Sequence, residues 1–287
     1  MNDRELLAAL ALPRLVGSAN HARVRDILKA ELSRRGFVVM EQRFPARTRW
    51  PLRGVTAVEG VNLIAVRPRS RVAVWITAHY DSKGQPVSMA LRLGLVGGAV
   101  AALIGIPVFG VVALGVALLL AALFLTLNRV TDASPGAVDN AAALVATFAI
   151  LDTLPASAAV GVIFPDAEEL GLVGARALVR ERANLLAGTA VINLDGLDDL
   201  GGTIAVQHRP GPLTRAIAKA IGATSWPWLP VVVDGQVLAR AAGECLTVMR
   251  GGWRTMGVVH TPRDTTERLS FAGARDIAAG IASVLAR

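Results

Sequence analysis

Cysteine is nearly absent from this sequence. Cys245 is the one cysteine among 287 residues, so no disulfide can form within the chain, and the composition fits a reducing compartment. Internal repeats, low-complexity tails and linkers long enough to separate the predicted elements into domains are also missing. A chain of this length can bury one large core, and we therefore expect a single main domain.

The sequence also lacks a basic stripe with aromatic partners. Its formal net charge of +8 comes mostly from arginines that are dispersed along the chain. A nucleic-acid-binding domain concentrates such residues on one surface, so we do not expect nucleic acid as a partner. Attraction to anionic lipid headgroups explains the positive charge equally well.

Charge is entirely absent from one long stretch, Leu93 to Leu127. This stretch is longer than the roughly 20 apolar residues that one membrane-spanning helix needs. The apolar run near the N-terminus, Leu6 to Leu12, is short, is broken by Pro13 and Arg14 and has no basic region before it, so we do not expect a secretory signal. The sequence therefore predicts a membrane-associated segment in the interior of the chain.

Outside this stretch, apolar runs of strand length alternate with amphipathic helical patterns, which predicts an α/β fold with a mixed or parallel sheet. The helical patterns lie at 18–36, 139–151, 171–180 and 213–221 and after Ser270. The predicted strands are 37–44, 61–66, 72–78, 159–165, 189–194, 203–207, 229–233 and 245–250.

Side chains capable of acid–base chemistry follow the buried strand 72–78. His79 and Asp81 stand two residues apart, so the carboxylate can accept the second ring N–H of the histidine and fix its tautomer. Taken alone, a His-x-Asp sequence is common. Asp139, in the segment GAVDN, is likewise best explained by itself as a helix N-cap.

Three further acids follow the next two strands. Glu168 and Glu169 come after 159–165, and Asp195 comes after 189–194. The carboxyl ends of such strands meet in one crevice, where carboxylates repel one another unless a cation holds them together. The sequence therefore predicts a metal site.

The order of these residues is more specific than any one of them. The series runs from His79 and Asp81 through Asp139, the Glu168–Glu169 pair and Asp195 to His260 in HTPRDT. It resembles the motifs of the co-catalytic di-zinc aminopeptidases, metallopeptidase family twenty-eight, which also includes glutaminyl cyclases and the transferrin-receptor ectodomain. The resemblance covers most of the chain except the apolar stretch. It implies a three-layer α/β/α zinc-exopeptidase fold around a central mixed, mostly parallel sheet.

The resemblance also implies a role for each residue. His79 and Asp195 would bind one zinc ion, Glu169 and His260 would bind a second, and Asp139 would bridge the two. Each ion would keep an open position, which is typical of catalytic zinc, and cobalt or manganese could replace it. The catalytic residues would be Glu168, as general base, and Asp81, as the partner of His79.

The implied reaction is the hydrolysis of N-terminal peptide bonds, with peptides that have a free N-terminus as substrates. A water that bridges the metals would attack the scissile carbonyl after giving a proton to Glu168. A glutaminyl-cyclase-like acyltransferase is one alternative, but such relatives tend to use one zinc ion, and His79 is retained here. A non-catalytic receptor or scaffold is another, but such relatives lose ligands. The segment before Cys245 matches no pattern that predicts side-chain preference.

The apolar stretch leaves the domain after His79 and returns before Asp139, although both residues must reach one metal pair. It must therefore cross a membrane twice or not at all. We expect a helical hairpin with arms at 86–105 and 107–127, in which glycines allow close approach. This divides the chain into a single zinc aminopeptidase domain, 1–85 with 130–287, and an inserted transmembrane or membrane-embedded hairpin, 86–129.

Basic residues flank the open end of this hairpin, namely Lys83, Arg92 and Arg129. The positive-inside rule then predicts a cell-membrane protein with its catalytic domain on the cytoplasmic face. The alternative is a soluble hairpin that is buried in a homodimer interface.

Overall fold

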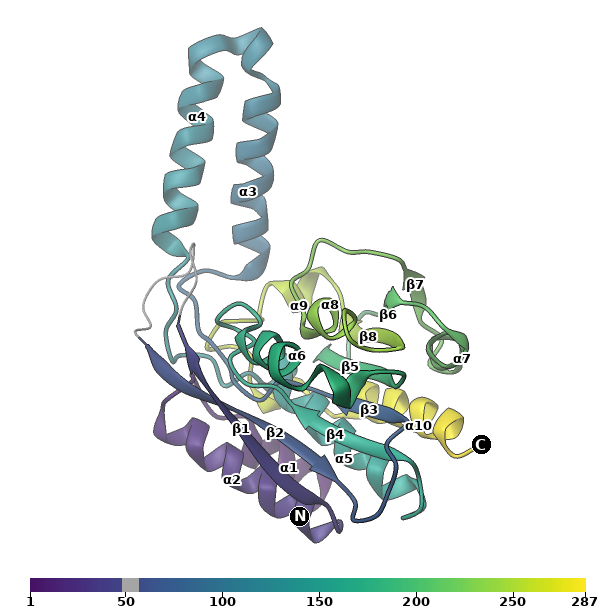
Figure 1. Cartoon of the computed structure of the whole chain (residues 1–287). Coiled ribbons are helices and arrows are strands. Elements are labelled where there is room, and N and C mark those ends of the chain that lie inside the picture. The colour runs from purple at the N-terminus through teal and green to yellow at the C-terminus, as the bar shows by residue number, and fades with distance from the viewer. Residues whose placement is uncertain (48–56) are drawn as a thin grey trace.

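The computed structural model describes residues 1–47 and 57–287 (Figure 1). Its strands are β1 (Val38–Ala46), β2 (Val58–Val66), β3 (Val74–Thr77), β4 (Val160–Phe164), β5 (Ala190–Leu197), β6 (Gly202–Arg209), β7 (Thr224–Trp226) and β8 (Glu244–Gly251). Its α-helices are α1 (Asp3–Leu10), α2 (Ala19–Arg34), α3 (Met89–Ile104), α4 (Ile106–Leu127), α5 (Ala142–Thr153), α6 (Val173–Leu186), α7 (Pro212–Ala220), α8 (Asp234–Leu238), α9 (Trp253–Met256) and α10 (Ala272–Leu285). A π-helical turn, η1 (Ala137–Ala141), precedes α5, and a 3-10 turn, η2 (Thr266–Arg268), precedes α10.

The strands form one eight-stranded sheet in the order β1-β2-β4-β3-β5-β8-β6-β7. The central strands β4, β3, β5 and β8 are parallel to one another. Antiparallel pairs join β1 to β2, β2 to β4 and β6 to β8. Nearly every residue of β3, β4 and β5 is buried, because parallel strands at the centre of a sheet are covered on both faces.

Helices cover both faces of this sheet (Figure 1). On one face α1, α2, α5, α7 and α10 contribute to a core that contains Ile76, Val162 and Ile192. On the other face α6 and α8 pack with Trp75 and Ile163. Successive side chains of a strand point to opposite faces, so each central strand contributes to both cores. The predicted three-layer α/β/α arrangement with a mostly parallel centre is confirmed.

Local signals account for the ends of α2. The Ser18 side chain accepts a hydrogen bond from the backbone N–H of His21 at 3.2 Å, and Gly36 adopts a φ of 78° just after the helix. Both fit the helical pattern at 18–36, because an N-cap side chain satisfies a free N–H and glycine alone adopts positive φ without strain.

One predicted strand is wrong. Residues 229–233 form the connection between β7 and α8, and the strand lies earlier, at Thr224–Trp226. Pro230 interrupts this segment and Pro227 directly follows β7, and proline cannot donate a hydrogen bond to a sheet. A run of β-branched residues alone was therefore insufficient to predict the strand.

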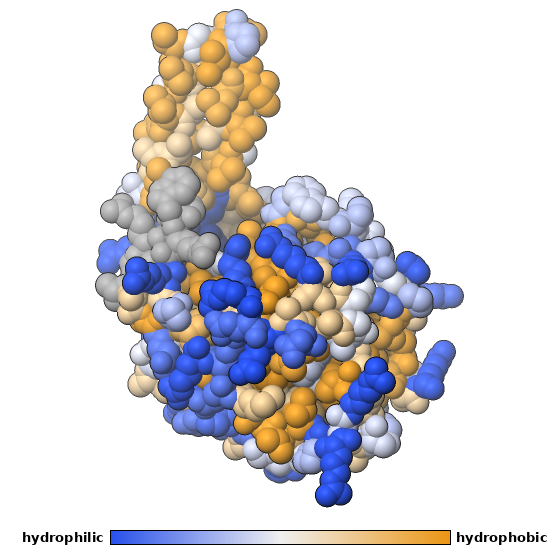
Figure 2. Space-filling model, in the orientation of Figure 1, coloured by the Kyte–Doolittle hydropathy of each residue, from blue (hydrophilic) through white to orange (hydrophobic). Residues whose placement is uncertain are grey.

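The apolar stretch forms two helices, α3 and α4, that pack together and project from the domain (Figure 1). They meet at Gly105, and Gly110 departs from helical geometry near the tip. Within these two helices, Ala113 and Ala117 alone are buried. The exposed surface of the hairpin is mostly hydrophobic, as Figure 2 shows. By length and composition α4 could cross a membrane, whereas α3 is shorter.

Candidate active site

Strand ends and loops from distant parts of the chain bring the predicted ligands together. His79 follows β3, Glu169 follows β4, and Asp195 lies in the last half of β5. Asp139 lies in η1, and His260 lies between α9 and η2. Because β3, β4 and β5 are parallel neighbours, their carboxyl ends present the first three side chains at one edge of the sheet.

The five side chains form two groups that share one residue. Nε2 of His79 lies 3.0 Å from Oδ1 of Asp139 and 3.8 Å from Oδ1 of Asp195. Nε2 of His260 lies 3.1 Å from Oδ2 of Asp139 and 3.1 Å from Oε1 of Glu169. Within each group, ligand atoms lie within 4.8 Å of one another. Asp139 thus presents one oxygen to each group, as a bridging carboxylate does.

Several atoms of this cluster are buried without a hydrogen-bond partner among the described residues. They are Nε2 of His79, Oδ1 of Asp139, Oε1 of Glu169 and Oδ2 of Asp195. Buried polar atoms that lack a partner cost free energy, so a ligand at this position would be favourable. Imidazole nitrogens and carboxylate oxygens at this spacing suit zinc, and the residues present therefore fit a divalent ion in each group.

Charge within the cluster is partitioned between acids and histidines. Burial lowers the pKa of His79, but the close carboxylates of Asp139, Asp195 and Asp81 outweigh it and raise that pKa well above its usual range. Burial raises the pKa of Asp139, but the close imidazoles of His260 and His79 hold it well below its usual range. Protons and a metal ion thus compete for the same histidine Nε2 atoms.

Glu168 is the acid of the cluster that belongs to neither group. Its side chain is buried, and its carboxylate forms no hydrogen bond among the described residues. Burial raises the pKa of Glu168 well above its usual range; the carboxylates of Glu169, Asp195 and Asp234 add to this effect, and His79 opposes it. A carboxyl group with a raised pKa and a free side chain has the properties of a general acid–base group.

Asp81 holds the loop that carries the two glutamates. Its two carboxylate oxygens accept hydrogen bonds from the backbone N–H groups of Glu168 and Glu169, each at 3.1 Å. Its Oδ1 also lies 3.4 Å from Nδ1 of His79, while the Asp81 carbonyl oxygen is closer, at 3.2 Å. Asp81 therefore positions both the glutamates and the histidine.

Two residues fix the turn that carries Asp139. The Asp264 carboxylate accepts hydrogen bonds from the backbone N–H groups of Val138, at 2.7 Å, and Asp139, at 3.2 Å. The Asn140 amide donates to the Leu194 carbonyl at 3.0 Å, and its oxygen accepts from the Gly196 N–H at 3.1 Å. Asn140 thereby links η1 to the end of β5, which carries Asp195.

Arg14 has a structural role that its sequence context did not predict. Its fully buried guanidinium donates to the carbonyl oxygens of Tyr80, at 2.7 Å, and Gly136, at 3.0 Å, and also to those of Leu12 and Pro135. It therefore connects the loop after β3 to the turn before Asp139. No sequence motif around Arg14 indicated this role, because its partners are backbone atoms of distant segments.

Asp234 at the start of α8 was also missed. It is buried, both of its carboxylate oxygens lack a partner among the described residues, and burial raises its pKa well above the usual range. His79, Asp195, Asp81 and Glu169 are the charged groups that act on it. The signal was present, since Asp234 directly follows a β-branched run, as Asp195 follows its strand.

Two basic residues from the foot of the hairpin face the cluster. Lys83 Nζ lies 2.7 Å from Oε2 of Glu169, and Nη2 of Arg92 lies 2.7 Å from Nδ1 of His260. In the sequence both residues flank the apolar stretch, as Arg129 does. Arg129 is exposed, whereas Lys83 and Arg92 contact metal-site side chains.

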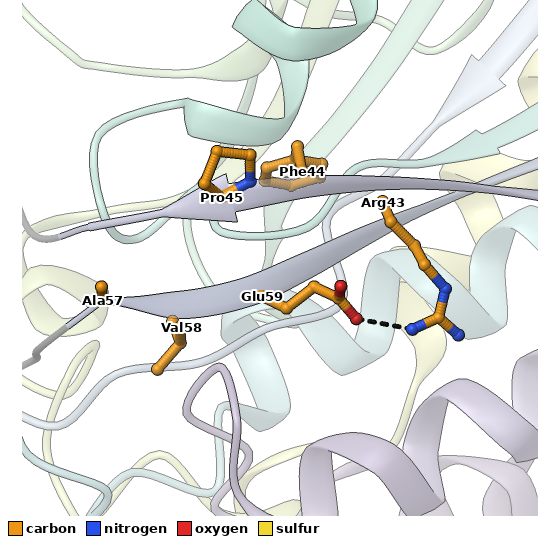
Figure 3. A pocket seen from close by; sticks show the side chains of 6 residues that line it. All are labelled: Arg43, Phe44, Pro45, Ala57, Val58 and Glu59. Atoms are coloured by element: carbon orange, nitrogen blue, oxygen red, sulfur yellow. Dashed lines mark hydrogen bonds and ion pairs between the residues drawn. The ribbon is translucent and has the colours of Figure 1, made fainter.

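A separate shallow groove lies between the facing ends of β1 and β2 (Figure 3). It is lined by Arg43, Phe44, Pro45, Ala57, Val58 and Glu59. Its two charged residues, Arg43 and Glu59, are exposed and form a salt bridge, with Nη1 of Arg43 2.5 Å from Oε1 of Glu59. This groove contains none of the ligand residues.

Comparison with solved structures identifies the fold. Porphyromonas gingivalis glutaminyl cyclase is similar at a TM-score of 0.67 and 15% identity, over 99% of this chain and 96% of that one. A Zn-dependent exopeptidase from Parabacteroides distasonis is similar at a TM-score of 0.65 and 17% identity, over 99% of this chain and 97% of that one. A leucine aminopeptidase precursor from Bacteroides thetaiotaomicron is similar at a TM-score of 0.64 and 14% identity, over 99% of this chain and 94% of that one. No curated protein sequence matches the chain significantly.

The sequence itself carries the family assignment. The family model described as "Peptidase family M28" matches residues 62–227 of this chain. This range includes His79, Asp139, Glu168, Glu169 and Asp195. The match spans more than half of the chain and agrees with the resemblance drawn from the motifs. These residues converge in the structure as a site for divalent metal must, and the chain accordingly belongs to peptidase family M28.

Proposed function

We propose that this chain is a membrane-anchored aminopeptidase that uses two zinc ions. The observation that carries the proposal is the division of the Asp139 carboxylate between two ligand groups, with Glu168 beside both. One group would be His79, Asp139 and Asp195, and the other Asp139, Glu169 and His260. Zinc bound there would lower the pKa of a water, polarise the scissile carbonyl and bind the α-amine of the substrate.

The residues of the chain would then perform the proton transfers. Glu168 would accept a proton from the attacking water and return it to the leaving amine. Asp81 would hold Glu168 in place, because it accepts the hydrogen bond of the Glu168 backbone N–H at 3.1 Å. Lys83 and Arg92 would keep Glu169 and His260 oriented.

The structural likeness to glutaminyl cyclases makes cyclisation of an N-terminal glutamine the rival activity. The two reactions give different products, since hydrolysis releases a free amino acid and cyclisation releases ammonia. The presence of His79 and Asp195 as a second ligand group favours hydrolysis, because a co-catalytic pair of ions needs both groups.

The activity can be tested with one purified preparation. Unblocked peptides, matched N-acetylated peptides and peptides with an N-terminal glutamine would be compared, and amino acids and ammonia measured. We expect amino-acid release from the unblocked peptides alone, loss of that release with a chelator and recovery with zinc. Preference for blocked peptides, or ammonia release without amino-acid release, would contradict the aminopeptidase assignment.

The proposed anchor is the hairpin formed by α3 and α4. Large apolar side chains cover its exterior, for example Ile104, Val108 and Val111, whose exposed fractions are 75%, 77% and 83%. Soluble proteins rarely expose a continuous apolar surface of this kind, and a bilayer would cover it. α4 is about 33 Å long at 22 residues, which matches the ~30 Å hydrocarbon core.

Deletion of residues 89–127 tests the anchor. Because Gly84 and Thr131 already pair at the foot of the hairpin, a short linker there should leave the domain intact. We expect the full chain in the membrane fraction and the deleted form in the soluble fraction. Sedimentation of the deleted form with membranes would contradict the proposal, and a full chain that is soluble as a homodimer would favour an interface between copies.

Cytoplasmic orientation can be tested by thiol labelling. Cys245 is fully buried, and burial raises the pKa of its thiol, so the native chain offers no reactive cysteine. Arg215→Cys would place a thiol on the exposed surface of α7. We expect a membrane-impermeant maleimide to label this variant only after cells are permeabilised. Labelling of intact cells would contradict the orientation.

A further inference from the structure

The end of the catalytic domain from which the hairpin projects carries exposed aromatic side chains. Trp226 ends β7, and Trp228 and Val232 lie in its connection to α8, with exposed fractions of 46%, 66% and 67%. Trp253 begins α9 and is 68% exposed. We call these four residues the aromatic face. Figure 1 shows α9 and the β7–α8 connection at the hairpin end of the domain, and α9 contacts α3.

The two segments that carry the aromatic face contain no acidic residue, whereas Asp132, near the foot of α4, is exposed. No charged residue occurs between Ala223 and Val233, and the two charged residues of the segment 251–263 are the exposed Arg254 and Arg263. Arg129, at the foot of α4, is also exposed. Tryptophan is enriched at membrane–water interfaces, and arginine is attracted to anionic headgroups. The aromatic face therefore has the composition of a surface that contacts lipid headgroups.

The hairpin has no stalk that would hold the domain away from a membrane. α3 contains 16 residues and is thus about 24 Å long, which is less than the ~30 Å hydrocarbon core. Leu91 and Leu93, in its first turns, are 51% and 44% exposed. Burial of these residues in lipid brings the end of the domain that carries the hairpin into the headgroup region.

The ligand cluster lies at the same end of the domain. Arg92, in the first turn of α3, contacts His260, and the backbone N–H of Gln85 donates to the His260 carbonyl at 2.7 Å. The Gln85 side chain also donates to Asn128, the residue that ends α4, at 2.5 Å. His260 is therefore linked to α3 through the Arg92 side chain and to the end of α4 through Gln85.

From these observations we infer that the aromatic face rests on the bilayer surface and that the substrates are polypeptides held in the same membrane, whose free N-termini reach the site from the headgroup layer. This inference rests on the proposed anchor and the proposed aminopeptidase activity. It specifies both the surface that contacts lipid and the class of substrate. A downstream apolar segment would retain such a substrate beside the enzyme and raise its effective concentration.

Contact with lipid can be measured by quenching of tryptophan fluorescence. The full chain would be reconstituted in phosphatidylcholine–phosphatidylglycerol vesicles with or without brominated acyl chains. Trp50 lies outside the described residues, so each variant would carry Trp50→Phe and would retain Trp228 or Trp253 as the one exposed tryptophan. The control would replace all the exposed tryptophans and add Ala8→Trp, on exposed α1 at the opposite end of the domain (Figure 1). Trp75 is buried in the core and gives a constant background.

We expect brominated lipid to reduce the Trp228 and Trp253 signals about twofold, as for interfacial tryptophan, and to leave the Ala8→Trp signal unchanged. Equal signals with and without bromine at Trp228 and Trp253 would overturn the inference about the face, provided the protein has entered the vesicles.

The substrate class can be tested in the same vesicles with one peptide in two forms, soluble and with a C-terminal acyl anchor. We expect kcat/KM to be about tenfold or more higher for the anchored form, because both partners share the surface. Trp228→Glu with Trp253→Glu should reduce this ratio and leave the soluble rate unchanged. Hydrolysis of the soluble form without preference for the anchored form would overturn this inference alone. Failure to hydrolyse either form would overturn the proposed function.

Discussion

Replacing Glu168 by glutamine would test the assignment of the general base. The carboxylate forms no hydrogen bond among the described residues, and its position is fixed through the backbone by Asp81. Glutamine has nearly the same volume and keeps that backbone contact, so we expect the variant to fold, and chemical denaturation would check its free energy of unfolding. Glutamine cannot accept the proton of the attacking water.

The loss should therefore appear in kcat and not in metal content. A positioned general base contributes about 10²- to 10⁴-fold to rate, which corresponds to ~3 to ~5 kcal/mol of transition-state stabilisation. The assay is release of the N-terminal amino acid from an unblocked peptide at saturating substrate, with zinc per chain measured on the same sample. KM should change little.

Glu169→Gln is the matched control, because it removes the same charge from the neighbouring residue. Oε1 of Glu169 lies 3.1 Å from Nε2 of His260, within one ligand group, so this variant should lose zinc as well as activity. Full activity of Glu168→Gln, or a loss of activity that is matched by loss of zinc, would refute the role given to Glu168.

Three further predictions concern two residues that support the ligand loops, Asp81 and Arg14, and one salt-bridged residue of α2, Glu31. Asp81→Asn keeps one acceptor oxygen, whereas the backbone N–H groups of Glu168 and Glu169 need one each. Zinc affinity, measured by competition with a chelating dye, should therefore fall about 10- to 100-fold. Unchanged affinity would contradict the positioning role of Asp81. In Arg14→Lys the ammonium group cannot donate to all the carbonyl oxygens that the guanidinium binds. Chemical denaturation should show a loss of about 1–3 kcal/mol in the free energy of unfolding. Equal stability would show that those contacts are dispensable. Burial alone would raise the pKa of Glu31, but hydrogen bonds from Arg34 and Arg35 lower it. Its contribution to stability is thus present above the unfolded pKa and is lost as the pH falls through the lower folded pKa. Glu31→Gln should therefore cost stability at neutral pH and progressively less on acidification, and a constant difference would contradict this assignment.

The central strands and the ends where chemistry occurs could be predicted from the sequence because their signals are local. β3, β4 and β5 are continuous apolar runs, and His79, Glu169 and Asp195 lie at or just beyond their carboxyl ends. The failed strand at 229–233 shows the limit of this argument. Its β-branched residues were visible, but its prolines determined the structure.

The ligand series could be predicted, whereas its support could not. Arg14 donates to carbonyl groups, Lys83 and Arg92 reach the cluster from the foot of the hairpin, and Asp234 comes from the start of α8. None of these contacts follows from spacing in the sequence, because each depends on how separate segments pack. The sequence also does not place α9 beside α3, and the proposed membrane-facing end of the domain depends on that contact.

The claim on which the account depends is that Asp139 joins two metal ions. Elemental analysis of zinc per chain by mass spectrometry tests it directly, on the full chain and on three variants. We expect two zinc ions in the full chain, one in His79→Ala, one in His260→Ala and fewer than one in Asp139→Ala. A full chain that holds a single ion, which either histidine variant removes completely, would contradict the account.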